Sequence, residues 1–303
     1  MQMNRRRFLA ISAAAFGAAR PALAAPRQIW TGVALGARAS IRLDHPQAEA
    51  IAARAAAEIA RLEGIFSLYR ADSALSQLNA AARLTAPPPE LLECLTLAGS
   101  IHRATGGLFD PTVQPLWALW AERATAGSRP TVDALAATRA LGQWADLRLD
   151  AGEITMAPGM GLTLNGIGQG YIADRIAALL EAEGLTDILI DTGELRALGG
   201  QPDGGDWPVM LEQGGSVALR ARALATSAPL GTVFDAAGRF GHILYPATGE
   251  PALPRWRGVS ISAPSAALAD GLSTAAVLAP EKAQILAAVS GFPGAACESA
   301  MQA

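Results

Sequence analysis

The sequence predicts a single α+β domain in which helices pack against mixed, mostly antiparallel sheets. Of its 303 residues, 51% are hydrophobic but only 5% are aromatic, and alanine is plentiful, which favours helices around a packed sheet. Short apolar runs broken by glycine, proline and aspartate are concentrated after Leu195, so the second half of the chain is expected to be rich in strands. No linker or internal repeat interrupts residues 26–303, which are therefore assigned to one domain.

Residues 1–25 are predicted to be a targeting segment. The letters N-R-R-R-F-L at 4–9 contain a twin arginine followed by Phe-Leu, an alanine-rich apolar run comes next, and Ala22-Leu23-Ala24 matches a small-x-small cleavage site. This pattern predicts a twin-arginine export signal and a periplasmic protein. No cysteine lies near the cleavage site, so no lipid anchor is indicated. An ordinary secretory signal is the alternative, and either signal leads out of the cytoplasm.

Net charge and cysteine usage exclude some functions. A formal net charge of −3 without a basic face argues against nucleic acid as the main partner. Cys94 and Cys297 match no disulfide framework and no metal-binding spacing. We expect two small buried hydrophobic residues, with a structural pair left open.

The elements before the central stretch follow from apolar periodicity and from caps. Asp72 or Ser73 can cap a short helix that directs Leu75 and Leu78 inward. Trp117 and Trp120 lie three residues apart and are expected to pack. The remaining expected elements are one or two strands over 29–43, helices over 48–65, 90–104 and 131–141, a surface loop over 124–130, and paired strands over 154–164.

The central stretch runs from Gly161 to Leu195 and predicts a strand, a glycine loop, an amphipathic helix and a second strand. Gly166, Gly168 and Gly170 are expected in the loop, where backbone amides at a helix start could bind a phosphate. A tight turn would explain the same glycines, because their G-x-G-x-G spacing is not that of a dinucleotide fold.

The second half supplies a candidate metal pair. A helix is predicted from Pro264 and Ser265 through Thr274, and on it Asp270 and Thr274 are four residues apart and share a face. A carboxylate and a hydroxyl suit Mg²⁺, although a capping aspartate and a threonine bonded to the previous turn would fit equally well. Strands are expected over 207–211, 216–221, 223–227, 240–245 and 258–262.

Several other polar and aromatic residues allow two interpretations each. Thr226 and Ser227 end a strand and could contact a phosphate or cap a turn. His242 lies on an expected strand and could be a packed, satisfied histidine. Tyr69 could stack on a flat ring or fill the core, and core is the default for an aromatic residue. Asp110 precedes a proline, so its backbone is expected to be extended.

Six motifs in one order resemble the ApbE family, the FAD:protein FMN transferases. They are FSLYRADSALSQLN, TGGLFDPTVQPLWALW, LNGIGQGYIADR, ALATSAP, HILYPATG and SAALADGLSTAA. The resemblance covers nearly the whole mature chain, from about Gly32 to Leu278. The N-G-I-x-Q-G-Y loop together with the twin-arginine leader is similar to the periplasmic, NosX-like branch of that family.

The resemblance implies an ApbE-like (T-fold-like) domain and a reaction. Family members hold FAD with Mg²⁺ and pass FMN to a Thr or Ser hydroxyl of a target flavoprotein, releasing AMP; a membrane-bound respiratory subunit is one implied acceptor. The implied metal residues are Gly166, Asp270 and Thr274. The implied flavin residues are Leu35, Tyr69, Leu108, Phe109, Asp110, Thr163, Gln169, His242 and Ile243.

Cleavage of the FAD pyrophosphate requires charge neutralisation and an in-line hydroxyl, which positioning and electrostatics supply. A general base adds roughly 10²–10⁴-fold. His242 is the first candidate for that base, or for a group that orients the acceptor, and Asp110 is the second.

The chain departs from the family pattern at four places. Many members carry aspartate at Thr163, lysine or glutamate at Gln169 and aspartate at Tyr245, and the usual double glycine is contracted to Thr192-Gly193-Glu194. An FAD pyrophosphatase and a non-catalytic flavin carrier therefore stay open as alternatives. A dinucleotide oxidoreductase is disfavoured, because alternating βαβ units are missing elsewhere.

Overall fold

The protein is described by a computed structural model that covers residues 28–43, 45–202, 204–212 and 214–303. The predicted targeting segment lies outside these described residues. Within the described ranges, no helix combines the length and apolar character needed to cross a bilayer.

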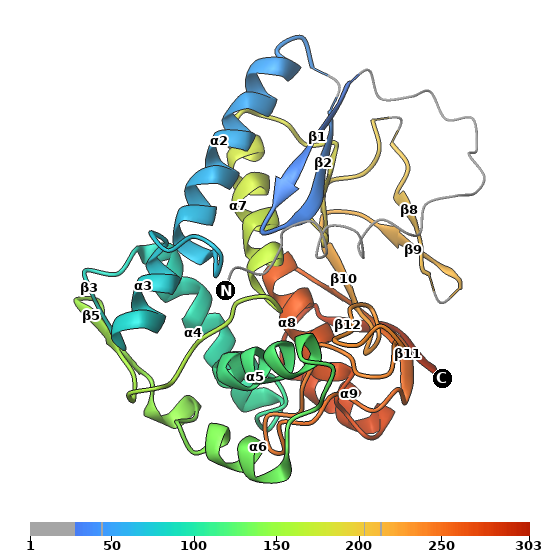
Figure 1. Ribbon diagram of the computed structural model, residues 1–303. Helices are drawn as coiled ribbons and strands as arrows, with labels where there is room; N and C mark the ends of the chain where they lie inside the picture. The colour runs from blue at the N-terminus through green and yellow to red at the C-terminus, as the bar shows by residue number, and fades with distance from the viewer. Residues whose placement is uncertain (1–27, 44, 203, 213) are drawn as a thin grey trace.

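The centre of the fold is a seven-stranded sheet in which every neighbouring pair of strands is antiparallel (Figure 1). Its order across the sheet is β1-β2-β6-β7-β10-β11-β12, so the chain enters at one edge and ends at the other. The strands are β1 Gln28–Ala34, β2 Ala37–Leu43, β6 Ile188–Asp191, β7 Leu195–Leu198, β10 Ala223–Ser227, β11 Trp256–Ala263 and β12 Ala296–Gln302. The predicted α+β class with antiparallel sheets is confirmed.

Two helices separated by almost a hundred residues form the layer that carries the site. α7 packs against α8 and β7, and α8 in turn packs against β10 and β11, while α2 runs beside α7 (Figure 1). The helices are α2 Ala48–Phe66, α3 Ala74–Ala81, α4 Pro89–Ala104, α5 Gln114–Thr125, α6 Val132–Arg139, α7 Gly168–Ala182, α8 Ala266–Ala276 and α9 Lys282–Ser290.

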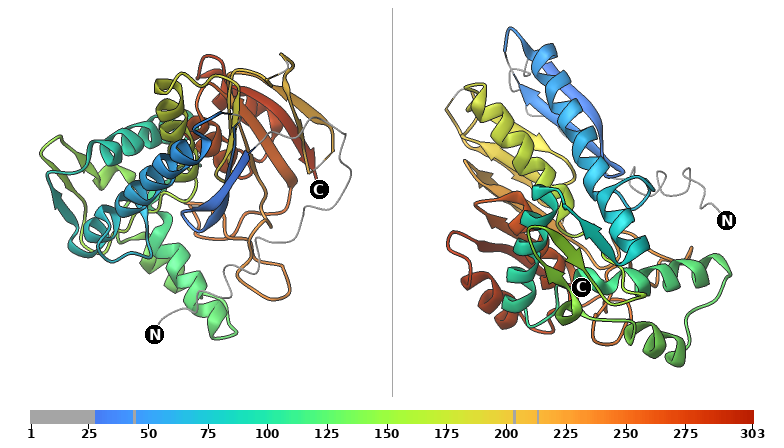
Figure 2. Two further views of the ribbon diagram at one scale, coloured as in Figure 1. Left: turned by 90° about the horizontal axis from the view of Figure 1, so that it is seen from above. Right: turned by 90° about the vertical axis from the view of Figure 1, so that its left-hand side faces the viewer.

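Strand alternation separates the two faces of the large sheet. Ile190 and Leu198 belong to the main core under the helices, whereas Leu189 and Ala197 pack on the opposite face. There they meet the hairpin of β8 (Trp207–Met210) and β9 (Ser216–Leu219). Viewed from above, the helices lie to one side of the sheet and this hairpin to the other (Figure 2).

The expected paired strands over 154–164 are wrong. Only β5 (Glu153–Thr155) forms, between β3 (Arg83–Thr85) and β4 (Arg148–Leu149). Further along, the Asn79 side chain takes both polar groups of the Leu162 backbone: Nδ2 donates to the Leu162 carbonyl at 2.8 Å and Oδ1 accepts its N–H at 2.7 Å. Because an asparagine on α3 satisfies this backbone, the segment needs no partner strand.

Two further expectations about backbone structure require correction. Residues 240–245 form no strand; the isolated bridges Val233↔Gly241 and Leu244↔Pro251 hold them instead. Gly168 and Gly170 lie in the first turn of α7 and not in the loop before it, since α7 begins at Gly168.

Local signals that depend on neighbouring residues are confirmed. Ser73 caps α3 and Ser265 caps α8, each accepting a backbone N–H through its hydroxyl. The strands predicted over 29–43 form a hairpin whose turn contains Leu35 at φ +48°. Cys94 and Cys297 are both free thiols, the first buried and the second half-buried.

Candidate active site

Gly166 lies directly against Thr274, although the two residues are far apart in sequence. A Cβ built on Gly166 would lie 2.9 Å from both Oγ1 and Cγ2 of Thr274, so only glycine fits there. The turn before α7 therefore meets the side of α8 that carries a predicted metal ligand.

Gly170 brings the second predicted ligand to the same place. Its backbone N–H donates to Asp270 Oδ2 at 3.3 Å. A Cβ on Gly170 would lie 2.3 Å from the Ala266 carbonyl oxygen, so the missing side chain is what allows α7 and α8 to approach. The amide is one of the unpaired donors at a helix start, and it favours the ionised carboxylate.

Asp270 faces a second buried carboxylate, Glu194, which follows β6. The two side chains are 3% and 8% exposed. Burial raises the pKa of Asp270 to about 7. Burial first, and then the charges of Asp270 and Asp191, hold the pKa of Glu194 well above its usual range. Both carboxylates are buried, so ionising the two together costs free energy unless a cation lies beside them.

A hydroxyl group at the end of β10 contacts the face of α8 that carries the predicted metal ligands. Ser227 Oγ lies 2.8 Å from Ser273 Oγ and 3.4 Å from Thr274 Oγ1. The Thr274 hydroxyl thus meets a neighbouring strand and makes no bond to the previous helical turn, and Asp270 is no cap, because Ser265 caps this helix. Neither purely structural interpretation of the pair describes its environment.

The donors present fit a hard divalent cation. Two buried carboxylates, a hydroxyl and the backbone around Gly166 offer only oxygen atoms. In the described ranges, no group of three or more His, Cys, Asp or Glu side chains could hold a metal by itself. A partial oxygen set is what Mg²⁺ uses when waters and substrate phosphates complete its coordination.

The hairpin turn at Leu35 closes over the start of α7. A Cβ on Gly168 would lie 3.0 Å from Leu35 Cδ1. The Leu35 N–H donates to Glu63 Oε1 at 2.9 Å, so a carboxylate of α2 holds this residue in its left-handed conformation. Leu35, a predicted flavin residue, is thereby fixed beside the glycine segment.

Asp110 and Thr163 lie in neighbouring backbone segments that are joined by a hydrogen bond. The Asp110 backbone is extended, as expected, and its Oδ1 accepts both the N–H and the hydroxyl of Thr112. The Thr163 N–H donates to the Pro111 carbonyl at 2.8 Å. Because Oδ1 is engaged in capping, any contact of Asp110 with substrate is left to Oδ2, which lies 3.8 Å from His102 Nδ1.

Phe109 and Leu108, the apolar residues before Asp110, belong to the main core. Phe109 is buried, whereas Leu108 is half-buried against the core. His102 Nδ1 lies 2.8 Å from the Phe109 carbonyl oxygen and therefore donates to it. This bond ties the D-P-T turn to the end of α4.

Gln169 faces the corner between β6 and β7. Its backbone carbonyl accepts the Thr192 hydroxyl at 3.0 Å, and a Cβ on Gly193 would lie 2.9 Å from Gln169 Oε1. The contracted T-G-E segment therefore packs on the first turn of α7, next to Asp270.

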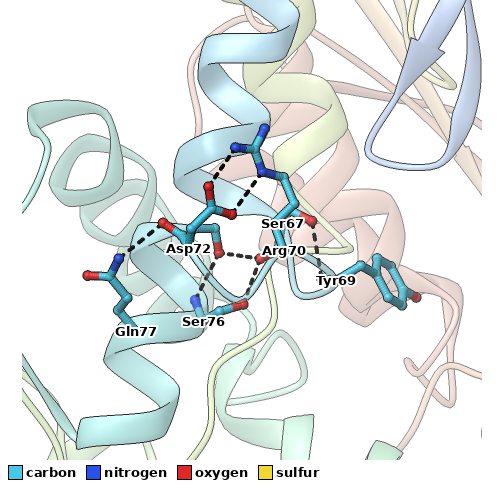
Figure 3. A network of polar contacts seen from close by, with 7 residues as sticks. Ser67, Tyr69, Arg70, Asp72, Ser76 and Gln77 are labelled. Carbon is cyan, nitrogen blue, oxygen red and sulfur yellow. Dashed lines mark hydrogen bonds and ion pairs between the residues drawn. The ribbon is translucent and has the colours of Figure 1, made fainter. Parts of the chain in front are cut away.

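Tyr69 is not a core residue, because 54% of it is exposed. Figure 3 shows its ring pointing away from the polar network around it. In that network Arg70 pairs with Asp72, and the Ser73 and Ser76 hydroxyls donate to the Ser67 carbonyl. The network fixes the turn after α2 and leaves the tyrosine ring accessible to a ligand.

His242 is anchored to Thr232, in the segment that follows β10. Its Nδ1 lies 3.0 Å from the Thr232 carbonyl oxygen, which can only accept, so Nδ1 carries the proton. Burial lowers the pKa of His242, which keeps the ring neutral near pH 7. Nε2 is then the basic nitrogen, while the next residue, Ile243, is buried and its carbonyl accepts the Ala252 N–H.

Sequence reasoning missed Glu194 as a member of this site. One signal for it exists: Glu194, Arg196 and Leu198 alternate with apolar residues facing the opposite side. Glu63 and Asn79 were also missed, and no local pattern distinguishes them from other polar helix residues.

Comparisons with known proteins all point to one family. The model of the ApbE family matches residues 35–295. An FAD:protein FMN transferase of Klebsiella pneumoniae is 31% identical over 265 residues, covering 80% of this chain and 75% of the relative. One from Treponema pallidum is 32% identical over 287 residues, covering 80% and 77%.

Solved structures agree in fold. The Pseudomonas stutzeri flavinyl transferase ApbE in its apo form has a TM-score of 0.75 at 28% identity, covering 87% of this chain and 88% of its own. The flavin transferase ApbE from Vibrio cholerae has a TM-score of 0.74 at 25% identity, covering 87% and 90%.

Proposed function

The chain belongs to the ApbE family, and from this premise we propose that it transfers FMN from FAD to a Ser or Thr hydroxyl of an acceptor protein with the help of Mg²⁺. It is a transferase, in keeping with its curated relatives. One observation supports the Mg²⁺-assisted reaction: Asp270 and Thr274 both contact the glycine segment at the start of α7. There, oxygen ligands lie beside the N-terminal end of α7, whose dipole favours a pyrophosphate.

The residues divide the work of the reaction. The acceptor hydroxyl oxygen attacks the phosphorus of the FMN half, the bond to the bridging oxygen breaks, and AMP leaves with that oxygen. His242 Nε2 would accept the hydroxyl proton, and the bond of Nδ1 to the Thr232 carbonyl supports this role. Asp270 and Thr274 would hold Mg²⁺, which neutralises charge on the phosphates when bound.

The flavin end of FAD is assigned to residues around the first turn of α7. Leu35 and Gln169 border the first turn of the helix from two directions, and the exposed ring of Tyr69 can stack on a flat ligand. Leu108, Phe109, Asp110, Thr163 and Ile243 complete the assigned set.

The test combines the purified protein, FAD, Mg²⁺ and a flavoprotein acceptor with a Ser/Thr target site. We expect a covalent FMN adduct on the acceptor, with AMP released in equal amount, and loss of both in Asp270→Ala. The control is Asp187→Asn, an exposed carboxylate. Free FMN formed at the same rate without acceptor would show hydrolysis in place of transfer, and unchanged turnover in Asp270→Ala would refute the metal assignment.

We also propose that residues 1–25 direct the protein to the periplasm, where the acceptor is a respiratory flavoprotein. The motif N-R-R-R-F-L supports this proposal. Replacing Arg5 and Arg6 together by lysine should retain the full-length protein in the cytoplasm, as measured by cell fractionation. Export that survives this change would refute the twin-arginine route.

A further inference from the structure

Glu194 is a buried carboxylate that directly precedes β7, and it lies on the side of the sheet that faces the helices. Arg196 on β7 pairs with Ile190 of the main core, so it faces α7 and α8. Glu194 precedes Arg196 by two positions, and strand alternation directs it to the same side. Two charged residues of opposite sign are thus presented side by side to the same pair of helices.

Arg196 has its counter-charge in Asp174. Arg196 Nε lies 3.3 Å from Asp174 Oδ1. The two Asp174 oxygens also accept the N–H groups of Ala266 and Ala267, at 2.8 and 2.9 Å. This carboxylate of α7 is therefore matched by a guanidinium and by the amide end of α8.

Glu194 lacks a comparable partner in the described part of the chain. The charges that act on it belong to Asp270 and Asp191, and both are negative. The positive charge of Arg42 partly compensates the negative charge of Asp191. The pair Glu194–Asp270 is left with two buried carboxylates and no neighbouring cation, which corresponds to the charge of one divalent ion.

Contacts of neighbouring residues link the segment that contains Glu194 to both helices that carry the predicted metal site. On one side, Thr192 and Gly193 pack on Gln169, whose neighbour Gly170 donates to Asp270. On the other side, the Thr226 amide is directed at Glu194, and the next residue, Ser227, contacts Thr274.

We propose that Glu194 is a further carboxylate of the divalent-cation site, acting on the same ion as Asp270. This inference rests on the proposed function for the existence of that ion and adds the residue that balances its charge. When both carboxylates are ionised, their two negative charges balance one divalent cation. Glu194 thus allows the cation to bind before FAD arrives, when no phosphate is present to supply negative charge.

The test is a titration of the chelator-treated full-length protein with Mn²⁺, followed by electron paramagnetic resonance, with and without FAD. Glu194→Gln keeps the shape and the acceptor for the Thr226 amide but removes the charge. Without FAD we expect it to weaken Mn²⁺ binding by roughly 10–100-fold. With FAD the loss should be smaller, because pyrophosphate oxygens replace the missing charge. Asp191→Asn is the matched control, expected to change the affinity less than about twofold, since Arg42 already offsets this carboxylate.

Thermal unfolding is a second readout, and it also checks that the variant folds. The Mg²⁺-induced rise in thermal midpoint should shrink in Glu194→Gln, while the midpoint in chelator should be equal to or above that of the wild type. Equal Mn²⁺ affinity in Glu194→Gln and wild type would overturn the inference and leave the proposed function standing. A wild-type protein that binds Mn²⁺ with the predicted dependence on Glu194 but transfers no FMN would overturn the proposed function and leave this inference standing. A wild-type protein that binds no cation would overturn the inference and the proposed function together.

Discussion

The Gly170 amide donates a hydrogen bond to the Asp270 carboxylate across 100 positions of sequence. This contact joins the first turn of α7 to the second turn of α8 and positions the predicted metal ligand against the glycine segment. It exists only because the two helices approach closely where Gly170 has no side chain.

Gly170→Ala should therefore destabilise the protein. The added Cβ would lie 2.3 Å from the Ala266 carbonyl oxygen, so the helices must separate. We expect a loss of about 1–3 kcal/mol in the free energy of unfolding, measured by urea denaturation. Gly64→Ala on α2 is the control: no atom lies within 4 Å of its added Cβ, and it should be neutral or stabilising by up to about 1 kcal/mol. Similar effects of the two substitutions would contradict the close-approach argument.

His242→Asn should remove the acidic limb of the transfer reaction. Burial lowers the pKa of His242, so the neutral ring is present at pH 7 and is lost only below the ordinary value of about 6.5. In the wild type, kcat/KM for the acceptor should fall as the pH drops below that value. The variant should be slower by roughly 10²–10⁴-fold and show no such limb. His45→Asn serves as the control, and an unchanged acidic limb in His242→Asn would exclude this histidine as the base.

The metal-free protein should lose stability as the pH rises. The folded pKa of Asp270 is raised to about 7, so its contribution is complete below the unfolded value of about 4 and disappears as the pH passes through 7. The difference in unfolding free energy between wild type and Asp270→Asn, measured in chelator, should therefore decrease between about pH 4 and pH 7. Saturating Mg²⁺ should reverse the trend, because the cation binds the ionised carboxylate. A difference that stays constant with pH would mean that Asp270 is not buried as a carboxylate.

Asn79→Ala should loosen the segment that leads into the glycine turn. The substitution removes both partners of the Leu162 backbone, and the cost should be about 1–3 kcal/mol in unfolding free energy. Gln77→Ala, on the same helix, removes one exposed hydrogen bond to the Asp72 carbonyl and should cost far less. Urea denaturation compares the two, and equal losses would refute the anchoring role of Asn79.

Much of the fold follows from local signals that need few neighbours. Ser73 was identifiable as a candidate cap, and Ser265 as the start of a helix, because a cap bonds within its own first turn. Asp270 and Thr274 were placed on one helix face because four residues complete about one turn. The hairpin of β1 and β2 follows from alternation around a glycine turn.

Two segments that were wrongly predicted to be strands depend on contacts outside their own sequence. Residues 161–164 have the apolar content of a strand, but a side chain from α3 satisfies the Leu162 backbone instead of a ladder. Residues 240–245 alternate like a strand yet make only isolated bridges. In the first case the partner is remote in sequence, whereas in the second the nearby segments around Thr232 and Glu250 take the backbone hydrogen bonds.

Sequence alone determined the α+β class, the helix that carries Asp270 and Thr274, and the resemblance to a flavin transferase family, because periodicity and motif order are properties of contiguous residues. Tertiary structure decided that Gly166 and Gly170 touch that helix, that the His242 proton lies on Nδ1, and that Glu194 is buried where the charge of Asp270 acts on it. The physical reason is that burial and charge compensation depend on every element that surrounds a group, and only the folded chain brings those elements together.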